Sequence, residues 1–344
     1  MSRNTIEIMK TVGSLALSKV YGLVTRLRNW LYDRELLTAH KVPIPIVCIG
    51  NLGIGGNAKT PLCLFLVTQL KKRGYKPVIL SRGYGGTLKG PHIITPTDDS
   101  KEVGDEPLML HRLSGVPIVI GGNRVMAANF IVANKLGDLI VLDDGFQHRR
   151  LKRNVDIVSV NITSREDIEE FLSNNILPYG KLREDRDQAL IRADMIIFAE
   201  RLVGKPIQEL PVELIKILPK HLQVYKAHLI SNGVKSLDKK HELKPRREVL
   251  AFCAIANPQG FFKSLEQLGY KIREKFSYPD HYQFSEKDLE RMTALHPELP
   301  LICTEKDAVK LDSSQADRIY TLITELVVEP TDAFIVQILK NLNK

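Results

Sequence analysis

A glycine-rich segment that ends in a lysine–threonine pair is the part of this sequence that points most directly to chemistry. The segment reads GNLGIGGNAKT over residues 50–60 and follows an apolar stretch at 44–49. Glycines let backbone N–H groups turn inward around a phosphate, and a following helix adds the positive end of its dipole. In such loops the lysine reaches the terminal phosphates and the hydroxyl binds Mg²⁺. We therefore predict that ATP is bound by Gly53, Ile54, Gly55, Gly56, Asn57, Ala58, Lys59 and Thr60.

One residue departs from the usual form of this loop. The common pattern has glycine immediately before the lysine, whereas Ala58 stands there in this chain. Its methyl group could crowd a phosphate or strain the turn, and a glycine-rich turn that binds nothing is the alternative interpretation. The strand–loop–helix setting and the intact Lys59–Thr60 pair favour nucleotide binding.

Paired carboxylates follow another apolar stretch, at residues 139–142. Asp143 and Asp144 come directly after it. A kinase of this type needs a carboxylate at the end of a neighbouring strand to hold Mg²⁺, directly or through water. Aspartate and glycine also favour turns, and a simple turn after a strand explains Asp143, Asp144 and Gly145 equally well.

Two further positions are candidates for proton transfer. Asp105 lies in the string VGDEP, where it could act as the base that a hydroxyl-directed kinase needs. The same string is a good helix start with aspartate as the N-cap, which is a strong alternative. His281 lies in YPDHY and could relay a proton, although a histidine in a loop is more often only solvated.

Four polar residues are weaker candidates for contacts with substrate or phosphate. Arg82 and Arg124 follow glycine-rich turns and could bind phosphate with two hydrogen bonds, although a surface position is the default for arginine. Gln147 and His148 continue the string DDGFQH that begins with the paired aspartates.

The elements that must position these residues indicate an α/β fold. Apolar stretches that alternate with helical segments predict a mostly parallel sheet covered on both faces. The predicted strands of the first part lie at residues 44–49, 78–80, 116–120, 139–142, 155–160 and 195–199. Residues 231–247 are polar and basic, which predicts a linker or an exposed hairpin. A second α/β pattern follows, with strands at 249–255, 270–276, 301–304 and 326–328, helices at 259–268 and from Ser285, and a last helix at 331–342.

The first forty residues form a separate pattern. Apolar residues recur at helical spacing over residues 5–37, and lysines and arginines interrupt them, which predicts a long basic amphipathic helix. Such a helix can pack on the domain, or it can lie in a membrane interface with its cations toward anionic headgroups. From the residues alone, packing is the commoner case.

Composition excludes several classes of protein. The chain has 344 residues, 44% of them hydrophobic, and a net charge of +9. These values exclude a disordered tail, a collagen-like fibre and a disulfide miniprotein. The four cysteines are scattered without a CxxC pair, which favours reduced, buried thiols over a zinc site. The positive charge fits an anionic partner, but only 6% of residues are aromatic and no nucleic-acid motif occurs, so we expect no nucleic-acid binding.

Eight short strings, taken in order, resemble one known family. The chain is similar to the tetraacyldisaccharide 4′-kinases of lipid A biosynthesis over nearly its whole length. The strings are GNLxxGGxxKT, SRGYGG, VGDEP, GNRVxAA, DDGFQH, LPxGxLRE, YPDHY and TEKD. The resemblance implies transfer of the γ-phosphate of ATP to the 4′-hydroxyl of tetraacyldisaccharide 1-phosphate, which gives lipid IVA.

The resemblance also implies roles for individual residues. Lys59 and Thr60 match the lysine and threonine of the phosphate loop, Asp105 matches the general base, and His281 matches its partner in a dyad. Acidic residues around Mg²⁺ and the phosphates match Glu106, Asp143 and Asp144. Two alanines depart from the family pattern: Ala58 replaces a glycine of the phosphate loop, and Ala256 falls where glycine is usual.

The implied architecture is a P-loop NTPase-like three-layer α/β/α domain, a smaller α/β domain and an N-terminal amphipathic helix. We expect the helix at 1–40, the kinase domain at 41–230, the linker at 231–247 and the smaller domain at 248–330, with 331–344 returning to the kinase domain. Such enzymes are peripheral on the cytoplasmic face of the inner membrane, and we expect a monomer. A substrate with four acyl chains stays in the bilayer, because each buried CH₂ contributes about 0.8 kcal/mol, so interfacial docking of the first helix becomes the favoured interpretation.

Two alternative functions remain open at this point. The chain could be a P-loop kinase or ligase that acts on a soluble acceptor. It could also be a membrane-associated nucleotide-binding paralogue whose catalysis is impaired by Ala58.

Overall fold

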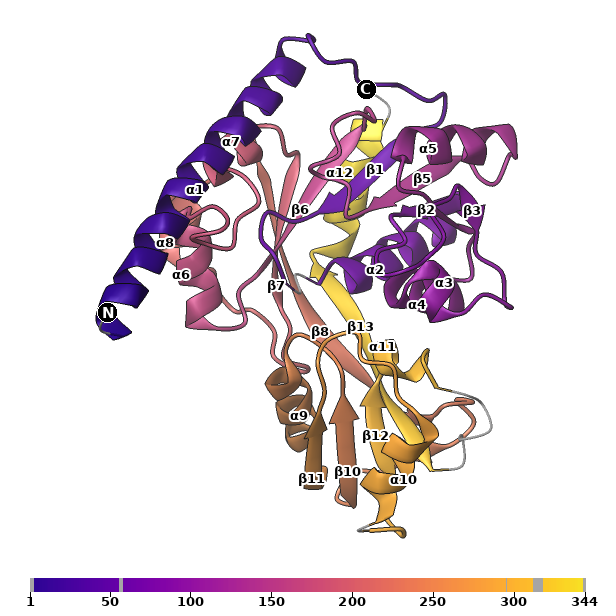
Figure 1. The fold of residues 1–344 in the computed structure, drawn as a ribbon. Helices are drawn as coiled ribbons and strands as arrows, with labels where there is room; N and C mark the ends of the chain where they lie inside the picture. The colour runs from indigo at the N-terminus through magenta and orange to yellow at the C-terminus, as the bar shows by residue number, and fades with distance from the viewer. Residues whose placement is uncertain (1–2, 56–57, 295, 312–317, 343–344) are drawn as a thin grey trace.

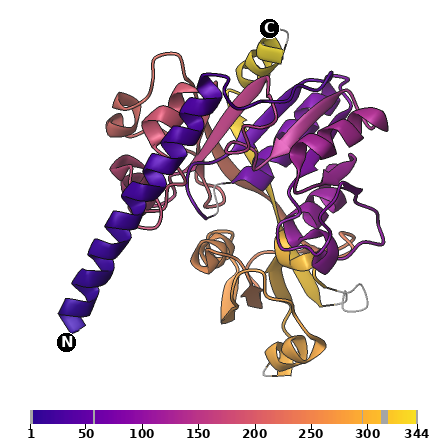
Figure 2. The same ribbon diagram turned by 45° about the horizontal axis from the view of Figure 1, so that its top comes forward.

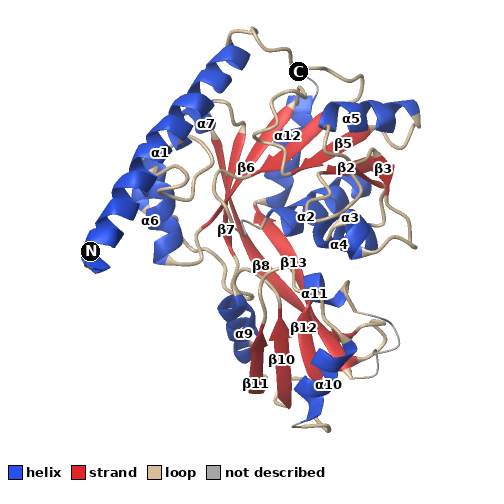
Figure 3. Cartoon of the chain, in the orientation of Figure 1, coloured by secondary structure: helices blue, strands red, loops and turns tan. Residues whose placement is uncertain are grey.

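A computed structural model describes residues 3–55, 58–294, 296–311 and 318–342, with side chains from residue 12 onward. Within these ranges the strands form one sheet in the order β11-β10-β12-β13-β8-β7-β6-β1-β5-β2-β4-β3, and β9 pairs with β8. The sheet runs through two lobes, and the two strands β8 and β13 join them (Figure 1; Figure 3). The prediction of a mostly parallel α/β fold is confirmed, because the pairs around β1, β2, β6 and β7 are parallel.

The first lobe is a parallel sheet with helices on both faces. Its strands are β1 (Ile46–Gly50), β2 (Pro77–Ser81), β3 (His92–Ile93), β4 (Ile118–Ile120), β5 (Leu139–Asp143), β6 (Val155–Asn161) and β7 (Met195–Glu200). Its helices are α2 (Lys59–Lys72), α3 (Ser100–Val103), α4 (Asp105–Ser114), α5 (Arg124–Ala133), α6 (Arg165–Ser173), α7 (Arg186–Ile191) and α8 (Val212–Lys216).

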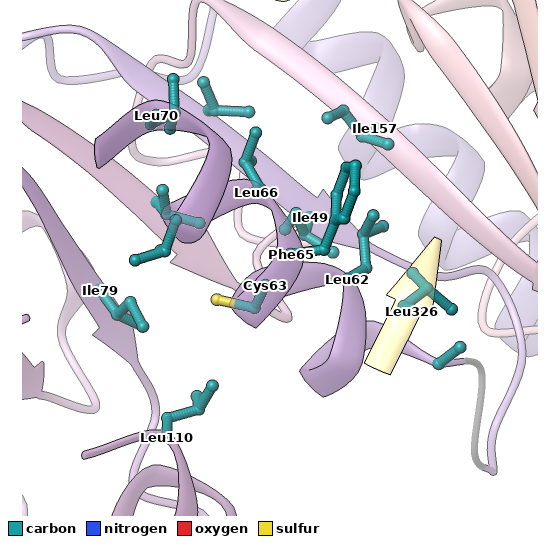
Figure 4. Packing of buried hydrophobic residues seen from close by; sticks show 14 of the residues in the cluster. Ile49, Leu62, Cys63, Phe65, Leu66, Leu70, Ile79, Leu110, Ile157 and Leu326 are labelled. Carbon is teal, nitrogen blue, oxygen red and sulfur yellow. The ribbon is translucent and has the colours of Figure 1, made fainter. Parts of the chain in front are cut away.

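Two apolar cores, one on each face of this sheet, make the lobe a three-layer structure. Alternate residues of β1 divide between them: Val47 and Ile49 enter the core under α2, α4 and α12, whereas Ile46 and Cys48 enter the core under α5, α6 and α7. Strands that are buried on both faces need continuous apolar sequence, which is why residues 44–49 and 139–142 carried no alternation. Figure 4 shows the first core, where the apolar side chains of α2 gather with Ile49 and Leu326.

The second lobe is smaller and continues the same sheet. Its strands are β9 (Glu242–Leu243), β10 (Glu248–Cys253), β11 (Lys271–Ser277) and β12 (Leu301–Thr304), and its helices are α9 (Pro258–Gln267), α10 (Glu286–Ala294) and α11 (Glu305–Ala308). The long strands β8 (Gln223–Ser236) and β13 (Ile319–Glu329) pair antiparallel between the lobes. A register shift between Leu322 and Thr324 interrupts this pairing, which is typical of a β-bulge.

The last helix, α12 (Thr331–Leu342), leaves β13 and packs on the first lobe. Its Phe334 is fully buried, with ring centroids 4.9 Å from Tyr225 and 6.3 Å from Phe65. The sequence prediction of a helix at 331–342 agrees with its bounds.

The first helix, α1 (Arg3–Asp33), packs through an unexpected face. Every described residue of α1 that is buried is small or polar: Ser18, Gly22, Thr25 and Asn29. Most of its described large apolar residues lie on the outer side instead, and Leu23 and Leu17 are 68% and 62% exposed. Figure 2 shows the first turns of α1 extending beyond the rest of the molecule.

Two sequence expectations about boundaries differ from the structure, and one agrees with it. The predicted break after residue 230 falls inside β8, where Ser231 and Val234 pair with β13 and Asn232 and Gly233 lie at the register shift between them. The hairpin expected within 231–247 does form, between β8 and β9. Helix α1 ends at Asp33 rather than near residue 40. Among the described residues, no helix has both the length and the apolar content that crossing a bilayer requires.

Candidate active site

The glycine-rich loop connects β1 to α2 and is held from one side by residues 181–183. Ile54 donates its backbone N–H to the Lys181 carbonyl at 2.9 Å, and Gly53 forms a bridge with Leu182. At Gly50 a Cβ would lie 2.4 Å from the Cβ of Phe146, so only glycine fits where the loop begins. Gly56 and Asn57, two of the predicted nucleotide contacts, lie outside the described residues.

Ala58 adopts a strained backbone conformation at the position where the common loop pattern has glycine. It is the N-cap of α2 with φ 55° and ψ 20°, a left-handed region that favours glycine. The side chain is 5% exposed and belongs to the core that also holds Ile49 and Leu62. Of the two effects considered from sequence, strain in the turn is present, and the methyl group also packs against apolar neighbours.

Lys59 and Thr60 open α2, where the first backbone N–H groups of the helix have no partner within the helix. Lys59 Nζ lies 3.2 Å from Asp144 Oδ1, and Arg183 pairs with the same carboxylate at 3.2 Å. Although burial opposes ionisation, these two cations hold the pKa of Asp144 below its ordinary value. Asp144 is therefore a charged carboxylate that positions the lysine of the loop.

Asp143 is the last residue of β5, and its surroundings shift its pKa in the opposite direction. It is 3% exposed, and its Oδ2 accepts a hydrogen bond from Ser81 Oγ at 3.1 Å. Its Oδ1 is buried and has no hydrogen-bond partner among the described residues. Burial, with the negative charges of Glu106 and Asp144 nearby, raises the pKa of Asp143 to about 7.

Asp105 meets His281 from the other lobe. Asp105 is the first residue of α4, and its Oδ2 lies 2.9 Å from His281 Nδ1. Helix α4 has Gly104 as its N-cap, with no side-chain cap, so the alternative that Asp105 caps the helix is wrong. Gly104 has φ 91°, and a Cβ there would lie 2.4 Å from the Tyr84 carbonyl, which makes glycine necessary before Asp105.

A buried lysine that the sequence analysis did not identify completes this contact. Lys310 is fully buried, and its Nζ lies 3.4 Å from Asp105 Oδ2 and 3.2 Å from Asp307 Oδ1. Burial raises the pKa of Asp105, but His281 and Lys310 outweigh that effect and hold it below its ordinary value. Asp307 also accepts a hydrogen bond from the backbone N–H of Ala254 at 3.2 Å, which ties the group to the second lobe.

The outer side of His281 faces a second lysine. Lys306, in α11, places Nζ 3.4 Å from His281 Nε2 and 2.9 Å from Asp280 Oδ1. If Nδ1 donates its proton to Asp105, Nε2 is the acceptor that faces this cation. Lys306 and Asp307 belong to the string TEKD, which the sequence analysis quoted without assigning a role. Lys310 had only its spacing of three residues from Asp307 as a signal.

The two sets of residues line one cavity of about 650 Å³ between the lobes. The first lobe contributes the loop residues Gly55, Ala58, Lys59 and Thr60 together with Ser81, Arg82, Glu106, Asp143, Asp144 and Arg183. The second lobe and its connection contribute Ala256, Asn257, Phe261, Asp280, His281, Lys306 and Glu325. Asp105 itself is 3% exposed, so His281 stands between it and the cavity.

Three of the weaker candidates do not reach this cavity. Arg124 is 5% exposed and donates to the backbone carbonyls of Gly121 and Gly122, so its prediction as a phosphate contact is not supported by its position. Gln147 donates to the Asn51 carbonyl at 2.8 Å and thereby contacts the loop from behind. Burial and neighbouring arginines lower the pKa of His148 to about 4, so its ring is neutral at pH 7.

The residues near the loop fit a cation whose ligands come partly from phosphates, rather than one that is bound by protein side chains alone. Among the described residues, no three His, Cys, Asp or Glu side chains gather as a metal site made only of protein would require. Mg²⁺ usually keeps several waters and takes one or two carboxylates plus phosphate oxygens. The buried, unpartnered Oδ1 of Asp143 and the hydroxyl of Thr60 match that set of ligands.

Comparison with known families gives a match over nearly the whole chain. The model of the family described as LpxK, tetraacyldisaccharide-1-P 4′-kinase, matches residues 14–343. The sequence is 37% identical over 314 residues to a tetraacyldisaccharide 4′-kinase of Halorhodospira halophila, covering 90% of this chain and 87% of that protein. It is 35% identical over 295 residues to the protein of the same name from Shewanella piezotolerans, covering 86% and 82%.

A solved structure is similar over the whole fold. It is the crystal structure of the "apo" form of LpxK from Aquifex aeolicus in complex with ATP. The TM-score is 0.76 at 27% identity, with 95% of this chain and 98% of that chain covered. The similarity therefore extends to both lobes.

Proposed function

Because this chain belongs to the tetraacyldisaccharide-1-P 4′-kinase family, we propose that it transfers the γ-phosphate of ATP to the 4′-hydroxyl of tetraacyldisaccharide 1-phosphate. The product is lipid IVA, an intermediate of lipid A biosynthesis. The observation that carries the proposal is the shared cavity, in which Lys59 and Thr60 of the phosphate loop face His281 of the second lobe.

The residues around the loop suit a triphosphate. The N-terminus of α2, the Lys59 ammonium and the Arg183 guanidinium supply positive charge on one side of the cavity. Asp144 holds Lys59 in place until phosphates compete for it, and Arg82 lies at the same cavity. Phosphoryl transfer depends chiefly on positioning and charge, so this arrangement supplies most of what the reaction needs.

Asp105 and His281 are placed to receive the proton of the sugar hydroxyl. The 4′-oxygen forms a bond to the γ-phosphorus while the bond from phosphorus to the β–γ bridging oxygen breaks, and ADP leaves. The hydroxyl proton passes to the Asp105–His281 pair and then to water. Asp105 orients the ring through Nδ1, which leaves Nε2 as the acceptor atom.

We propose that Mg²⁺ accompanies ATP, held by Thr60 and Asp143, with Glu106 and Asp144 nearby. When bound, this ion neutralises charge on the β- and γ-phosphates. The raised pKa of Asp143 supports the assignment, because a carboxylate buried without a counter-charge is costly until a cation binds.

The outward face of α1 suits a membrane surface. Leu17, Val20, Leu23, Leu27 and Trp30 are each about half exposed or more, and Lys19, Arg26 and Arg34 add positive charge. An apolar helical face beside cations binds an anionic interface, and the acyl chains of the substrate require such contact. We propose peripheral association with the cytoplasmic face of the inner membrane, where ATP is available.

We also propose that residues 248–330 act as a domain that closes on the kinase domain, which comprises 41–230 together with the returning segment 331–344. The lobes are joined by β8 and β13, whose pairing contains the bulge at Leu322. The hydrogen bond between His281 and Asp105 already links the two lobes, and closure around the substrates would limit ATP hydrolysis by water. One chain supplies all the groups of the described site, so we propose a monomer.

Mass analysis of the lipid tests the function. The purified chain is incubated with ATP, Mg²⁺ and tetraacyldisaccharide 1-phosphate in mixed micelles, and a product heavier by one phosphate is expected. A product formed on a soluble sugar but not on the lipid would favour the soluble-acceptor alternative. Binding of ATP without either product would favour an impaired paralogue.

A further inference from the structure

A short segment between α1 and the phosphate loop touches both of them. This segment, residues 175–185 and here called the strap, contains the string LPxGxLRE, of which the proposed reaction uses only the Arg183 side chain. Its internal hydrogen bonds, from Leu182 N to the Asn175 carbonyl and from Leu177 N to the Leu182 carbonyl, fold it into a compact turn. The strap therefore connects α1 to the phosphate loop.

On one side the strap receives the packed face of α1. Ser18 Oγ donates to the Ile176 carbonyl at 2.7 Å, and Asn29 Nδ2 donates to Glu184 Oε2 at 2.8 Å. Asn29 and Glu184 are 5% and 1% exposed, so this amide–carboxylate hydrogen bond is shielded from water. Buried hydrogen bonds to a charged group are stronger than exposed ones and costly to leave unmade.

On the other side the strap pairs with the phosphate loop. Besides the Ile54–Lys181 hydrogen bond, Arg183 donates its backbone N–H to the Leu52 carbonyl at 2.6 Å. The Arg183 side chain reaches Asp144, which in turn holds Lys59. The strap thus fixes both the backbone of the loop and the carboxylate that positions its lysine.

A side-chain path also crosses behind the strap. Glu184 Oε1 accepts from Gln147 Nε2 at 3.1 Å, and the same amide donates to the Asn51 carbonyl at 2.8 Å. Asn51 is fully buried and donates to the Gly53 carbonyl at 2.6 Å. Three polar side chains in series, Asn29, Glu184 and Gln147, therefore join α1 to the backbone of Asn51 at the start of the loop.

We propose that α1 has a second role besides membrane docking: through Asn29 and the strap, its packed face positions the phosphate loop for ATP. The loop contains the strained Ala58 and needs external support to keep its backbone N–H groups turned toward phosphate. Asn29 and Glu184 are positioning residues, since they touch no substrate, and small displacements of a loop that orients reacting groups are costly.

This inference rests on ATP binding at the loop, and its test separates the two. The dissociation constant for ATP in the presence of Mg²⁺ is measured by calorimetry on full-length protein in detergent micelles. For Asn29→Ala we expect binding that is weaker by about three- to tenfold, a matching rise in KM for ATP, and little change in KM for the lipid. Partition into anionic vesicles is expected to stay at the wild-type value, because Asn29 lies on the buried face.

Two further variants make the result specific. Ser18→Ala removes a second contact between α1 and the strap by deleting one hydroxyl, and a smaller loss of ATP affinity is expected. Asn134→Ala, at an exposed end of α5 where the amide donates to the Phe130 carbonyl, is the matched control and should bind ATP normally.

A double-mutant cycle tests whether the effect follows the described path. The double variant with Asn29→Ala and Gln147→Leu should lose less ATP-binding free energy than the two single variants lose together. Both changes interrupt the same series of hydrogen bonds. The inference is overturned if wild-type protein binds ATP and both Asn29→Ala and Ser18→Ala bind it equally well. Wild-type protein that binds no ATP would instead overturn the proposed function.

Discussion

The surroundings of two neighbouring carboxylates in this site shift their pKa values in opposite directions. Asp144 faces Lys59 and Arg183 and stays ionised, whereas Asp143 faces Ser81 and the charges of Glu106 and Asp144. The side-chain types alone do not distinguish them, because both follow the same strand. The position of the cations decides which of the two pKa values is lowered.

The raised pKa of Asp143 predicts a pH-dependent stability in metal-free buffer without nucleotide. The native carboxyl keeps its proton up to about pH 7, and the unfolded one releases it near 3.8. Between these values the native state binds more protons, so the free energy of unfolding falls as the pH rises through this window. Asp143→Asn cannot ionise and escapes this loss.

We therefore expect the stability of Asp143→Asn relative to wild type to rise by about 2 kcal/mol between about pH 5.5 and pH 8. Urea unfolding at a series of pH values measures it. A difference between the two proteins that stays constant with pH would show that Asp143 is ionised throughout. The variant should also lose transfer activity, since it lacks the carboxylate charge proposed for Mg²⁺.

At Ala58 we predict that strain and packing nearly cancel. Ala58→Gly relieves a left-handed conformation that costs about 1 kcal/mol, but it removes a buried methyl and loosens the unfolded chain. Stability is expected to change by no more than about 1 kcal/mol and the ATP dissociation constant by no more than about threefold. A gain in ATP affinity of more than tenfold would mean that the methyl group obstructs phosphate.

At the scale of elements, α1 shows why an apolar stripe does not reveal which face is packed. The sequence predicted an amphipathic helix over 5–37, and packing of its apolar stripe was the commoner interpretation. The structure instead buries Ser18, Gly22, Thr25 and Asn29, and it exposes the leucines. Periodicity shows that a helix has an apolar face and a polar face. Which of the two packs on the protein depends on distant residues such as Glu184.

Exposed leucines on α1 should contribute to vesicle binding and little to folding. Leu23→Ser is expected to weaken partition into vesicles that contain phosphatidylglycerol by about tenfold, since burying a leucine contributes about 1.5–3 kcal/mol. Cosedimentation measures the partition, and thermal unfolding should be unchanged because Leu23 is 68% exposed. Val336→Ser, at a site on α12 that is 60% exposed, is the matched control.

Equal vesicle binding by Leu23→Ser and Val336→Ser would contradict the docking proposal. In that case the outward face of α1 would have to serve another partner.

At the scale of the whole molecule, the site exists only where two lobes meet. Asp105 comes from the first lobe, whereas His281, Lys306 and Lys310 come from the second, and the sheet passes between the lobes through β8 and β13. Local sequence could predict the loop, the strand ends and the helix at 331–342, because short-range patterns encode them. It could not identify Lys310, since nothing adjacent distinguishes a buried lysine from a surface one.

The same limit explains the boundary that the sequence analysis misplaced. Residues 231–233 of β8 are interpreted from sequence as a polar linker, and only the pairing of this strand with β13, about ninety residues later, makes them part of the sheet. The sequence of β8 carries no periodic signal of this nonlocal pairing, because the outer side of the connection between β8 and β13 is polar.

Removal of Lys310 is predicted to destabilise the contact between the lobes. Lys310→Met leaves Asp105 and Asp307 buried without their cation, and breaking a buried pair costs about 3 kcal/mol or more. Urea unfolding should show that loss. Lys275→Met, which breaks an exposed pair with Glu266, should change stability by less than about 1 kcal/mol. Similar small changes for both variants would contradict a structural role for Lys310.

The most direct test of the account is single-turnover transfer of labelled γ-phosphate from ATP to the tetraacyl disaccharide by Asp105→Asn, with ATP binding measured on the same sample. Loss of the carboxylate that orients His281 should slow transfer by about a hundredfold or more while ATP affinity stays close to wild type. Asp332→Asn, at an exposed carboxylate on α12, should transfer phosphate at the wild-type rate. Transfer by Asp105→Asn at a rate close to wild type would contradict the proposal that the two lobes meet to move the hydroxyl proton.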